Sequence, residues 1–423
     1  MARGPLASGA DDDVPQGPAS PIRWLVLLGV WLVYATFGMT TVSLAPLVAT
    51  ITADLGITHG AMGVVFGAWQ LMFIASAVPS GRLMDRLGTG YGLFLGAVSV
   101  ALSGLLRSWS VDFWTLVAAV SVLGIGGPLI STGAPKVVAR WFQGQQRGLA
   151  MGIYITGPAL GSILSLSMTN SFLMPALGGD WRAVSRVWAA IAIAAGIAWL
   201  VIAHLPAIRQ ADVSARAGHA SAKRATLSEL LSVHAVRLLL MMSVGIFLFN
   251  HGLNNWLPEV LRSKGMTPVA AGYWATVPTL VGLAGSLVIP RLATPQRRHA
   301  MLGGLFAAGL LASLLLRVDE GPLLMLGLAM QGIARSSMMT VAMLTLVETP
   351  GIGERNAATA SGLFFSAAEV GGASGPLVLG IVHDLTGGFG ACLALLSAVM
   401  AILIAASVHL RRISRPPVPA IQT

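Results

Sequence analysis

Charged residues are scarce in this chain. Only 10% of its 423 residues are Asp, Glu, Lys or Arg, against roughly 25% in an average soluble domain, whereas 55% are hydrophobic. Cys392 is the only cysteine, which excludes an intrachain disulfide and a thiolate metal site. The histidines show no His-x-x-x-His spacing and no Walker-type glycine-lysine loop occurs, so we expect no metal, no nucleotide, no cofactor and no membrane enzyme.

Long apolar runs are abundant instead. In hydrocarbon such runs must form helices, because every backbone polar group needs a partner within the segment. We therefore predict an all-α membrane protein whose twelve transmembrane helices form two pseudo-symmetric six-helix bundles in the lipid bilayer. The predicted spans are 23–49, 61–80, 91–107, 112–137, 148–173, 184–204, 237–257, 269–289, 300–316, 322–347, 357–381 and 388–409.

Basic residues fall mainly on one side of these spans. Nineteen Lys and Arg residues lie on the side of the termini and six on the other, which satisfies the positive-inside rule and predicts that both termini are cytoplasmic. The net charge of +10 therefore reflects topology and not a nucleic-acid partner. We expect disordered tails at 1–20 and 413–423, bundles at 21–205 and 237–412, and a cytoplasmic linker at 206–236.

The two halves repeat each other. Small residues recur at an offset of 208 to 210 positions, and the pairs are Gly56 with Gly265, Thr58 with Thr267, Gly63 with Gly272, Gly124 with Gly332, and Gly161 with Gly371. A parallel repeat of this kind places a substrate site at the bundle interface near the membrane midplane. In this register Arg335 corresponds to Gly127, so the halves differ chemically where they meet.

Arg335 stands in the middle of the apolar run 322–347. A charge at that depth costs about 2.5–3.5 kcal/mol on insertion scales, so it must face a partner or a watery cavity. We interpret Arg335 as the counter-charge of an anionic substrate; the alternative is a structural arginine neutralised by Glu369 or by helix C-terminal carbonyls. Glu369 is near the middle of 357–381, and we expect it to pair with Arg335, either as a switch or as a static brace.

Other polar side chains at similar depth extend this site. Gln331 precedes Arg335 by one helical turn and shares its face. Asparagines at the end of the seventh span either line the cavity or bond to neighbouring helices. His251 and Glu369 can carry a proton and are the coupling candidates. The predicted substrate-binding residues are Tyr34, Gln70, Tyr154, Asn250, His251, Asn254, Gln331 and Arg335.

The loop 81–88 carries a recognisable pattern, formed by Gly81, Asp85, Arg86 and Gly88. It resembles the loop signature of the major facilitator superfamily, although Thr89 stands where a further basic residue is usual. The resemblance covers residues 21–412 and implies a secondary transporter with a cytoplasmic gate held by Asp85. The alternative is a solvated loop that merely follows the positive-inside rule. The equivalent loop 290–298 has no acid.

Three further stretches, 141–152, 255–258 and 371–376, look like the cyanate-permease, oxalate/formate and monocarboxylate groups, which carry small anions. We therefore expect a monomeric transporter that moves a small organic anion across the inner membrane by alternating access, with protons as a second candidate partner. The alternative is a proton-coupled exporter of hydrophobic or cationic drugs that uses Glu369. Gly157 and Pro158 resemble the motif of such antiporters, but Ile153 stands where the motif has glycine.

Overall fold

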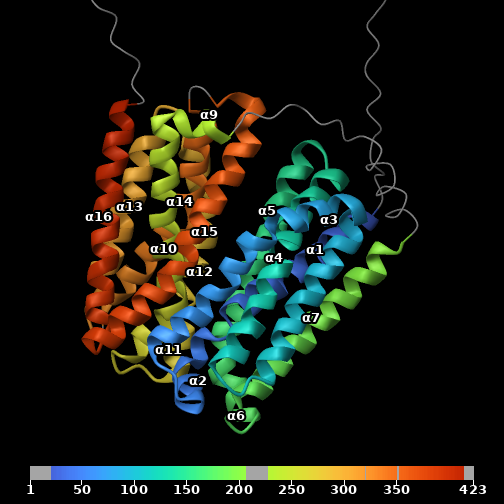
Figure 1. Ribbon diagram of the computed structural model, residues 1–423, viewed down its shortest axis with the longest axis vertical. Helices are drawn as coiled ribbons and strands as arrows, with labels where there is room; N and C mark the ends of the chain where they lie inside the picture. The colour runs from blue at the N-terminus through green and yellow to red at the C-terminus, as the bar shows by residue number, and fades with distance from the viewer. Residues whose placement is uncertain (1–20, 206–226, 320, 350–351, 414–423) are drawn as a thin grey trace, which may run out of the picture.

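The protein is described by a computed structural model that covers residues 21–205, 227–319, 321–349 and 352–413. These residues form helices joined by short turns, and no strand occurs among them. The predicted tail 1–20, residues 414–423 of the predicted tail 413–423, and residues 206–226 of the predicted linker lie outside the described residues. Figure 1 shows two groups of helices side by side, blue to green for the first half and yellow to red for the second.

The first half contains α1 (Ile22–Val42), η1 (Ala45–Leu47), α2 (Val48–Leu55), α3 (His59–Ser108), α4 (Phe113–Trp141), α5 (Gly144–Met168), the π-helical turn η2 (Thr169–Leu173), α6 (Met174–Ala176) and α7 (Trp181–Ala203). The second half contains α9 (Leu227–Ser232), α10 (His234–Arg262), α11 (Pro268–Trp274), α12 (Val277–Leu292), α13 (Arg298–Leu315), α14 (Pro322–Val347), α15 (Gly353–Thr386) and α16 (Phe389–Ile413).

Ten helical segments of the described chain are long and apolar enough to cross a membrane. One of them, α3, has 50 residues, which at about 1.5 Å per residue exceeds one bilayer crossing. Gly88 interrupts α3 with a non-helical backbone, φ 81° and ψ 172°, between the predicted spans 61–80 and 91–107. The 26-residue α14 is not among the ten because Gln331 and Arg335 lower its hydropathy. These two features support the predicted count of twelve.

Glycines that repeat in sequence make equivalent contacts in space. Gly161 of α5 lies against the backbone carbonyl of Ala35 on α1, and Gly371 of α15 lies against the carbonyl of Val244 on α10. The two carbonyl residues are themselves 209 positions apart. A side chain at either glycine would overlap the facing backbone, so the residue type sets how closely the paired helices approach.

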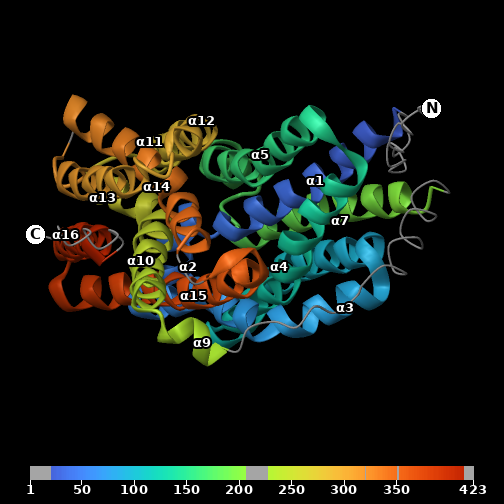
Figure 2. The ribbon, with the colours of Figure 1, turned by 90° about the horizontal axis from the view of Figure 1, so that it is seen from above.

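The two halves meet through a second pair of repeated glycines. Gly63 of α3 lies against the carbonyl of Pro376 on α15, and Gly272 of α11 lies against the carbonyl of Leu166 on α5. The second contact is the repeat image of the first with the halves exchanged. Seen from above, α15 lies beside α3, and α12 lies beside α5 (Figure 2). Bundle contact is therefore pseudo-symmetric.

Contact between the halves is concentrated at one end of the molecule, the end that holds α2, α6 and α11 in Figure 1. There Asn170 donates to the carbonyl of Pro268 at 3.4 Å. At the other end, where α1 begins and α16 ends, residues 144–149 at the start of α5 are exposed. Phe365 and Ser366, in the N-terminal half of α15, are exposed as well. The halves are thus closed on one side and separated on the other.

Candidate functional site

A cavity of about 410 Å³ lies between the halves, within the range of small-molecule sites. Its walls come from α1, α3 and α4 of the first half and from α15 of the second. Along α15 the lining runs from the exposed Phe365 and Ser366 to the buried Glu369, so the cavity opens toward the separated side. The main lining side chains are Tyr34, Phe37, Trp69, Phe73, Ser131, Thr132, Phe365, Ser366 and Glu369.

Aromatic rings form the wall on the first half. Tyr34 stacks on Tyr154 with ring centroids 5.7 Å apart and an interplanar angle of 14°. Phe37 meets Trp69 edge-on at 5.9 Å. Of the predicted binding residues, Tyr34 therefore lines the cavity and Tyr154 supports it from behind. Phe37, Trp69 and Phe73 were missed by the sequence reading, because aromatic residues in an apolar helix look like packing residues; the one-turn spacing of Trp69 and Phe73 was the available signal.

A polar group crosses the interface beside the cavity. Gln70 Nε2 on α3 lies 3.2 Å from His251 Nδ1 on α10. A Cβ placed on Gly372 would lie 3.0 Å from Glu369 Oε2 and 3.4 Å from both Gln70 Cγ and His251 Cδ2. The missing side chain of Gly372 thus leaves room for three predicted site residues to meet. Gln70 Oε1 and Glu369 Oε2 are buried without hydrogen-bond partners. These two oxygens are therefore free to accept hydrogen bonds from a ligand.

Arg335 does not pair with Glu369. Its Nη1 donates to Thr279 Oγ1 of α12 at 3.4 Å, and no ion pair joins it to Glu369 or to any other carboxylate of the described residues. The expected pairing of Arg335 with Glu369 is therefore wrong for this conformation. The reason is geometric: Arg335 lies on the face of α14 that packs on α12, whereas Glu369 lies on the face of α15 beside Gly372 and α3.

The remaining predicted binding residues lie around this region without lining the cavity. Gln331 is buried and its Oε1 has no hydrogen-bond partner, and the same holds for Asn250 Oδ1. Asn254 is half-buried. The neighbouring Asn255 turns back on its own helix, donating to the His251 carbonyl at 2.9 Å. The unpartnered amide oxygens of Gln331 and Asn250 extend the set of buried groups that a ligand could satisfy.

Residues 81–88 were expected to form a loop, but residues 81–87 continue α3 as a helix and Gly88 alone leaves helical geometry. Asp85 Oδ1 is 3.3 Å from Lys136 Nζ of α4, and both side chains are largely exposed. Arg86 is exposed, and nothing lies within 4 Å of the position of a Cβ on Gly81. Among the described residues, the ion-pair partner of Asp85 therefore belongs to the first half, and Gly88 provides the break in α3.

Arg107, a buried arginine in the last turn of α3, is neutralised in the way considered as the alternative for Arg335. Arg107 of α3 is 2% exposed, and its Nη1 donates to the Thr40 carbonyl at 2.8 Å and to Ser43 Oγ at 2.9 Å. Both acceptors are at the end of α1, where helix carbonyls lack intrahelical donors. Arg107 is thus a structural arginine, the role that was the alternative for Arg335.

The family model of the Major Facilitator Superfamily matches residues 30–376. The chain belongs to this superfamily. It is therefore a multi-pass membrane transporter and not an enzyme. The match leaves the resemblance to the cyanate-permease, oxalate/formate and monocarboxylate groups a prediction.

The relatives of this superfamily member have names that do not agree on one substrate. The chain is 24% identical over 387 residues to the uncharacterized transporter YycB of Bacillus subtilis, covering 90% of this chain and 92% of that one. It is 25% identical over 375 residues to a quinolone resistance transporter of Acinetobacter baumannii, with 82% and 84% covered. It is 24% identical over 298 residues to a D-galactonate transporter of Escherichia coli, with 65% and 68% covered.

A solved structure shares the fold. It is a bacterial homolog of the human lysosomal transporter Spinster in an inward-facing, unoccupied conformation, with a TM-score of 0.69 and 15% sequence identity over 94% of this chain and 96% of that one. At this identity the likeness extends to the fold alone.

Proposed function

We propose that this transporter moves a small organic anion and that Arg335 is its counter-charge. The observation that carries the proposal is that the guanidinium of Arg335 is not neutralised. It is half-buried in the middle of α14, and its hydrogen bond goes to the hydroxyl of Thr279 at 3.4 Å. No carboxylate of the described residues pairs with it. An unneutralised cation at membrane depth is unfavourable. A substrate carboxylate would neutralise it and accept charge-assisted hydrogen bonds.

Two further observations support an anion. Relatives of the chain are named as transporters of D-galactonate and of galactarate or D-glucarate, which are sugar-acid anions. The amide groups of Gln331 and Gln70 supply hydrogen-bonding atoms near the bundle interface, and their carbonyl oxygens are buried without partners. A hydroxylated carboxylate could donate to these oxygens and place its charge on Arg335.

Transport by alternating access fits the arrangement of the halves. They are closed on the side of α2, α6 and α11 and separated on the side where α1 begins. With the termini in the cytoplasm of the inner membrane, as the distribution of basic residues predicts, this conformation is inward-facing. In the outward-facing state we propose that Asp85 leaves Lys136 and holds the cytoplasmic side closed.

Glu369 is the proposed coupling group. Its carboxylate is buried in the cavity wall and Oε2 has no hydrogen-bond partner, so the ionised form is costly there and proton uptake relieves the cost. His251, bonded to Gln70, is the second group that can take up a proton.

A drug exporter is the second candidate, because the same cavity favours it. Five aromatic side chains line it, and among the described residues Glu369 is its only carboxylate and no cation lines it. Aromatic faces and a carboxylate suit a lipophilic cation, and one relative is named as a quinolone resistance transporter.

The deciding experiment measures binding and uptake by purified protein in liposomes, with small carboxylates and sugar acids in one panel and lipophilic cations in the other. Arg335→Gln should weaken anion binding about 10- to 100-fold, the value of one or two charge-assisted hydrogen bonds. Arg291→Gln, at an exposed position on α12, should leave it unchanged. Cation transport that survives Arg335→Gln but is lost in Glu369→Gln would establish the exporter and overturn the anion proposal.

A further inference from the structure

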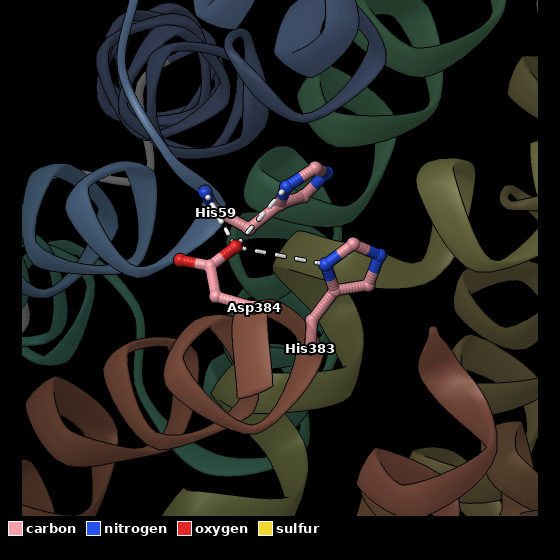
Figure 3. A group of neighbouring side chains, drawn as sticks. All are labelled: His59, His383 and Asp384. Atoms are coloured by element: carbon pink, nitrogen blue, oxygen red, sulfur yellow. Dashed lines mark hydrogen bonds and ion pairs between the residues drawn. The ribbon is translucent and has the colours of Figure 1, made fainter. Parts of the chain in front are cut away.

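Three side chains of types that can ligate a metal meet where the two halves close. His59 is the first residue of α3, and His383 and Asp384 lie in the last turn of α15. In Figure 3 both imidazoles turn a ring nitrogen toward the carboxylate of Asp384. Nδ1 of His59 is 3.5 Å from Asp384 Oδ1, and Nδ1 of His383 is 3.7 Å from the same oxygen. All three ligand atoms lie within 4.8 Å of one another.

These distances suit a shared ion better than direct hydrogen bonds. A nitrogen and a carboxylate oxygen in a hydrogen bond lie about 2.7–3.2 Å apart, which is shorter than either separation here. Two ligand atoms that each lie about 2.0–2.1 Å from a tetrahedral Zn²⁺ are roughly 3.3–3.4 Å apart. Nδ1 of His383 is also buried without a hydrogen-bond partner, so a ring nitrogen aimed at the carboxylate is unused.

The carboxylate is held in place by backbone groups. Asp384 Oδ1 accepts from the His59 N–H at 3.1 Å and Oδ2 accepts from the Gly60 N–H at 2.7 Å. Each oxygen keeps further acceptor capacity for a metal, and hydrogen-bonded carboxylates are the usual form of such ligands.

Apolar rings wall the group on one side. Phe389 lies 4.5 Å from the His383 ring, and Trp256 lies 5.6 Å from the His59 ring, between centroids. The side chains of His59, His383 and Asp384 are 26%, 18% and 30% exposed. An ion can therefore enter from water, and a water molecule can supply the fourth ligand.

We propose that His59, His383 and Asp384 bind a divalent transition metal of the Zn²⁺ class, and that this ion fastens the two halves together. His59 belongs to the first half and the other two ligands to the second, so the site exists only while this side is closed. A ligand that binds one conformation shifts the population toward it. Zn²⁺ therefore holds the transporter in the state described here and slows its cycle, whichever substrate it carries.

The binding site is tested by calorimetric titration of the purified full chain, freed of any histidine tag, with ZnCl₂. The expected result is one ion per chain, with affinity lowered at least tenfold in His59→Gln and in His383→Gln. His204→Gln is the matched control, because His204 lies at the other end of the bundle beside Tyr91, and it should bind as the parent does. Equal binding by the parent and both site variants would overturn the site.

The fastening is tested by the distance between the halves. Spin labels are attached at Ala53→Cys on α2 and at Leu385→Cys in the last turn of α15, in a Cys392→Ser background. Both positions are exposed. Zn²⁺ should move the distance distribution toward its shortest component, and His59→Gln should abolish the shift. Zn²⁺ binding without a shift would overturn the fastening. Equal elution volume and melting temperature of the variants show that they are folded.

Discussion

The two halves of this transporter share their packing and differ in their charges. Gly124 of α4 lies against the carbonyl of Trp69, and its repeat partner Gly332 of α14 lies against the carbonyl of Pro278. The carbonyl residues are again 209 positions apart. Close helix approach is thus encoded twice, by the same residue type at equivalent positions.

The polar chemistry is encoded once. Arg335 takes the place that Gly127 has in the first half, where the ring of Phe73 fills the space next to the glycine. Glu369 takes the place of Ala159, at the offset of 210 that relates Gly161 to Gly371. The comparison teaches that repeated positions build the scaffold, whereas the unrepeated ones carry the candidate function.

The largest effect is expected where the repeated packing is broken. Gly161→Leu and Gly371→Leu should each destabilise the fold by about 3 kcal/mol or more, because the new side chain overlaps a facing carbonyl. Gly152→Leu, where nothing lies within 4 Å of the added Cβ, is the matched control. Thermal melting in detergent measures the three. A large loss of stability at one glycine and none at its repeat partner would show that the two halves are not structurally equivalent there.

A smaller and purely functional effect is expected at an unrepeated position. Gly372→Val would press on Glu369 Oε2, which an added Cβ already approaches to 3.0 Å, and would disturb the meeting of Gln70 and His251. Transport should fall about tenfold, the equivalent of one lost hydrogen bond, while the melting temperature changes little. Gly304→Val, on an open face of α13, should transport normally. Unchanged transport in Gly372→Val would show that Gln70, His251 and Glu369 do not act together in transport.

The helix caps of the two halves should respond alike. Thr58 accepts from the Ala61 N–H at 3.2 Å, and its repeat partner Thr267 accepts from the Ala270 N–H at 3.2 Å. Each Thr→Ala change should lower the free energy of unfolding by about 1 kcal/mol. The double variant should lose the sum, because the caps share no partner. Denaturant or thermal unfolding measures the two losses of unfolding free energy. Clearly unequal losses would show that the halves are equivalent in helix packing but not in helix capping.

The smallest effect on stability is expected at the predicted gate residues. Asp85 and Lys136 form a largely exposed ion pair at 3.3 Å, which is worth less than about 1 kcal/mol. Asp85→Asn should therefore leave the melting temperature nearly unchanged but slow transport, since the proposed role of Asp85 lies in the opposite conformation. Normal transport rates in Asp85→Asn would show that Asp85 has no gating role and that residues 81–88 are a solvated surface segment.

Much of the fold could be predicted from the sequence, because long apolar runs indicate the membrane spans and recurring small residues indicate the repeat. The isolated charges of Arg335 and Glu369 were visible for the same reason. Their expected pairing was wrong, since depth along two spans does not specify which face of each helix a side chain occupies. The aromatic wall around Phe37 and Trp69 was missed because apolar side chains serve packing and binding equally well.

The amino-acid sequence is enough to specify a helical, two-fold repeated membrane transporter. The bilayer forces apolar segments into helices, and close packing requires glycines at matching positions. Which polar groups meet depends on the three-dimensional packing of the helices. It separated Arg335 from Glu369, and it brought His59 to His383 and Asp384 across more than 320 positions of chain. Such meetings depend on helix rotation and on how the two halves dock, which no local pattern in the chain records.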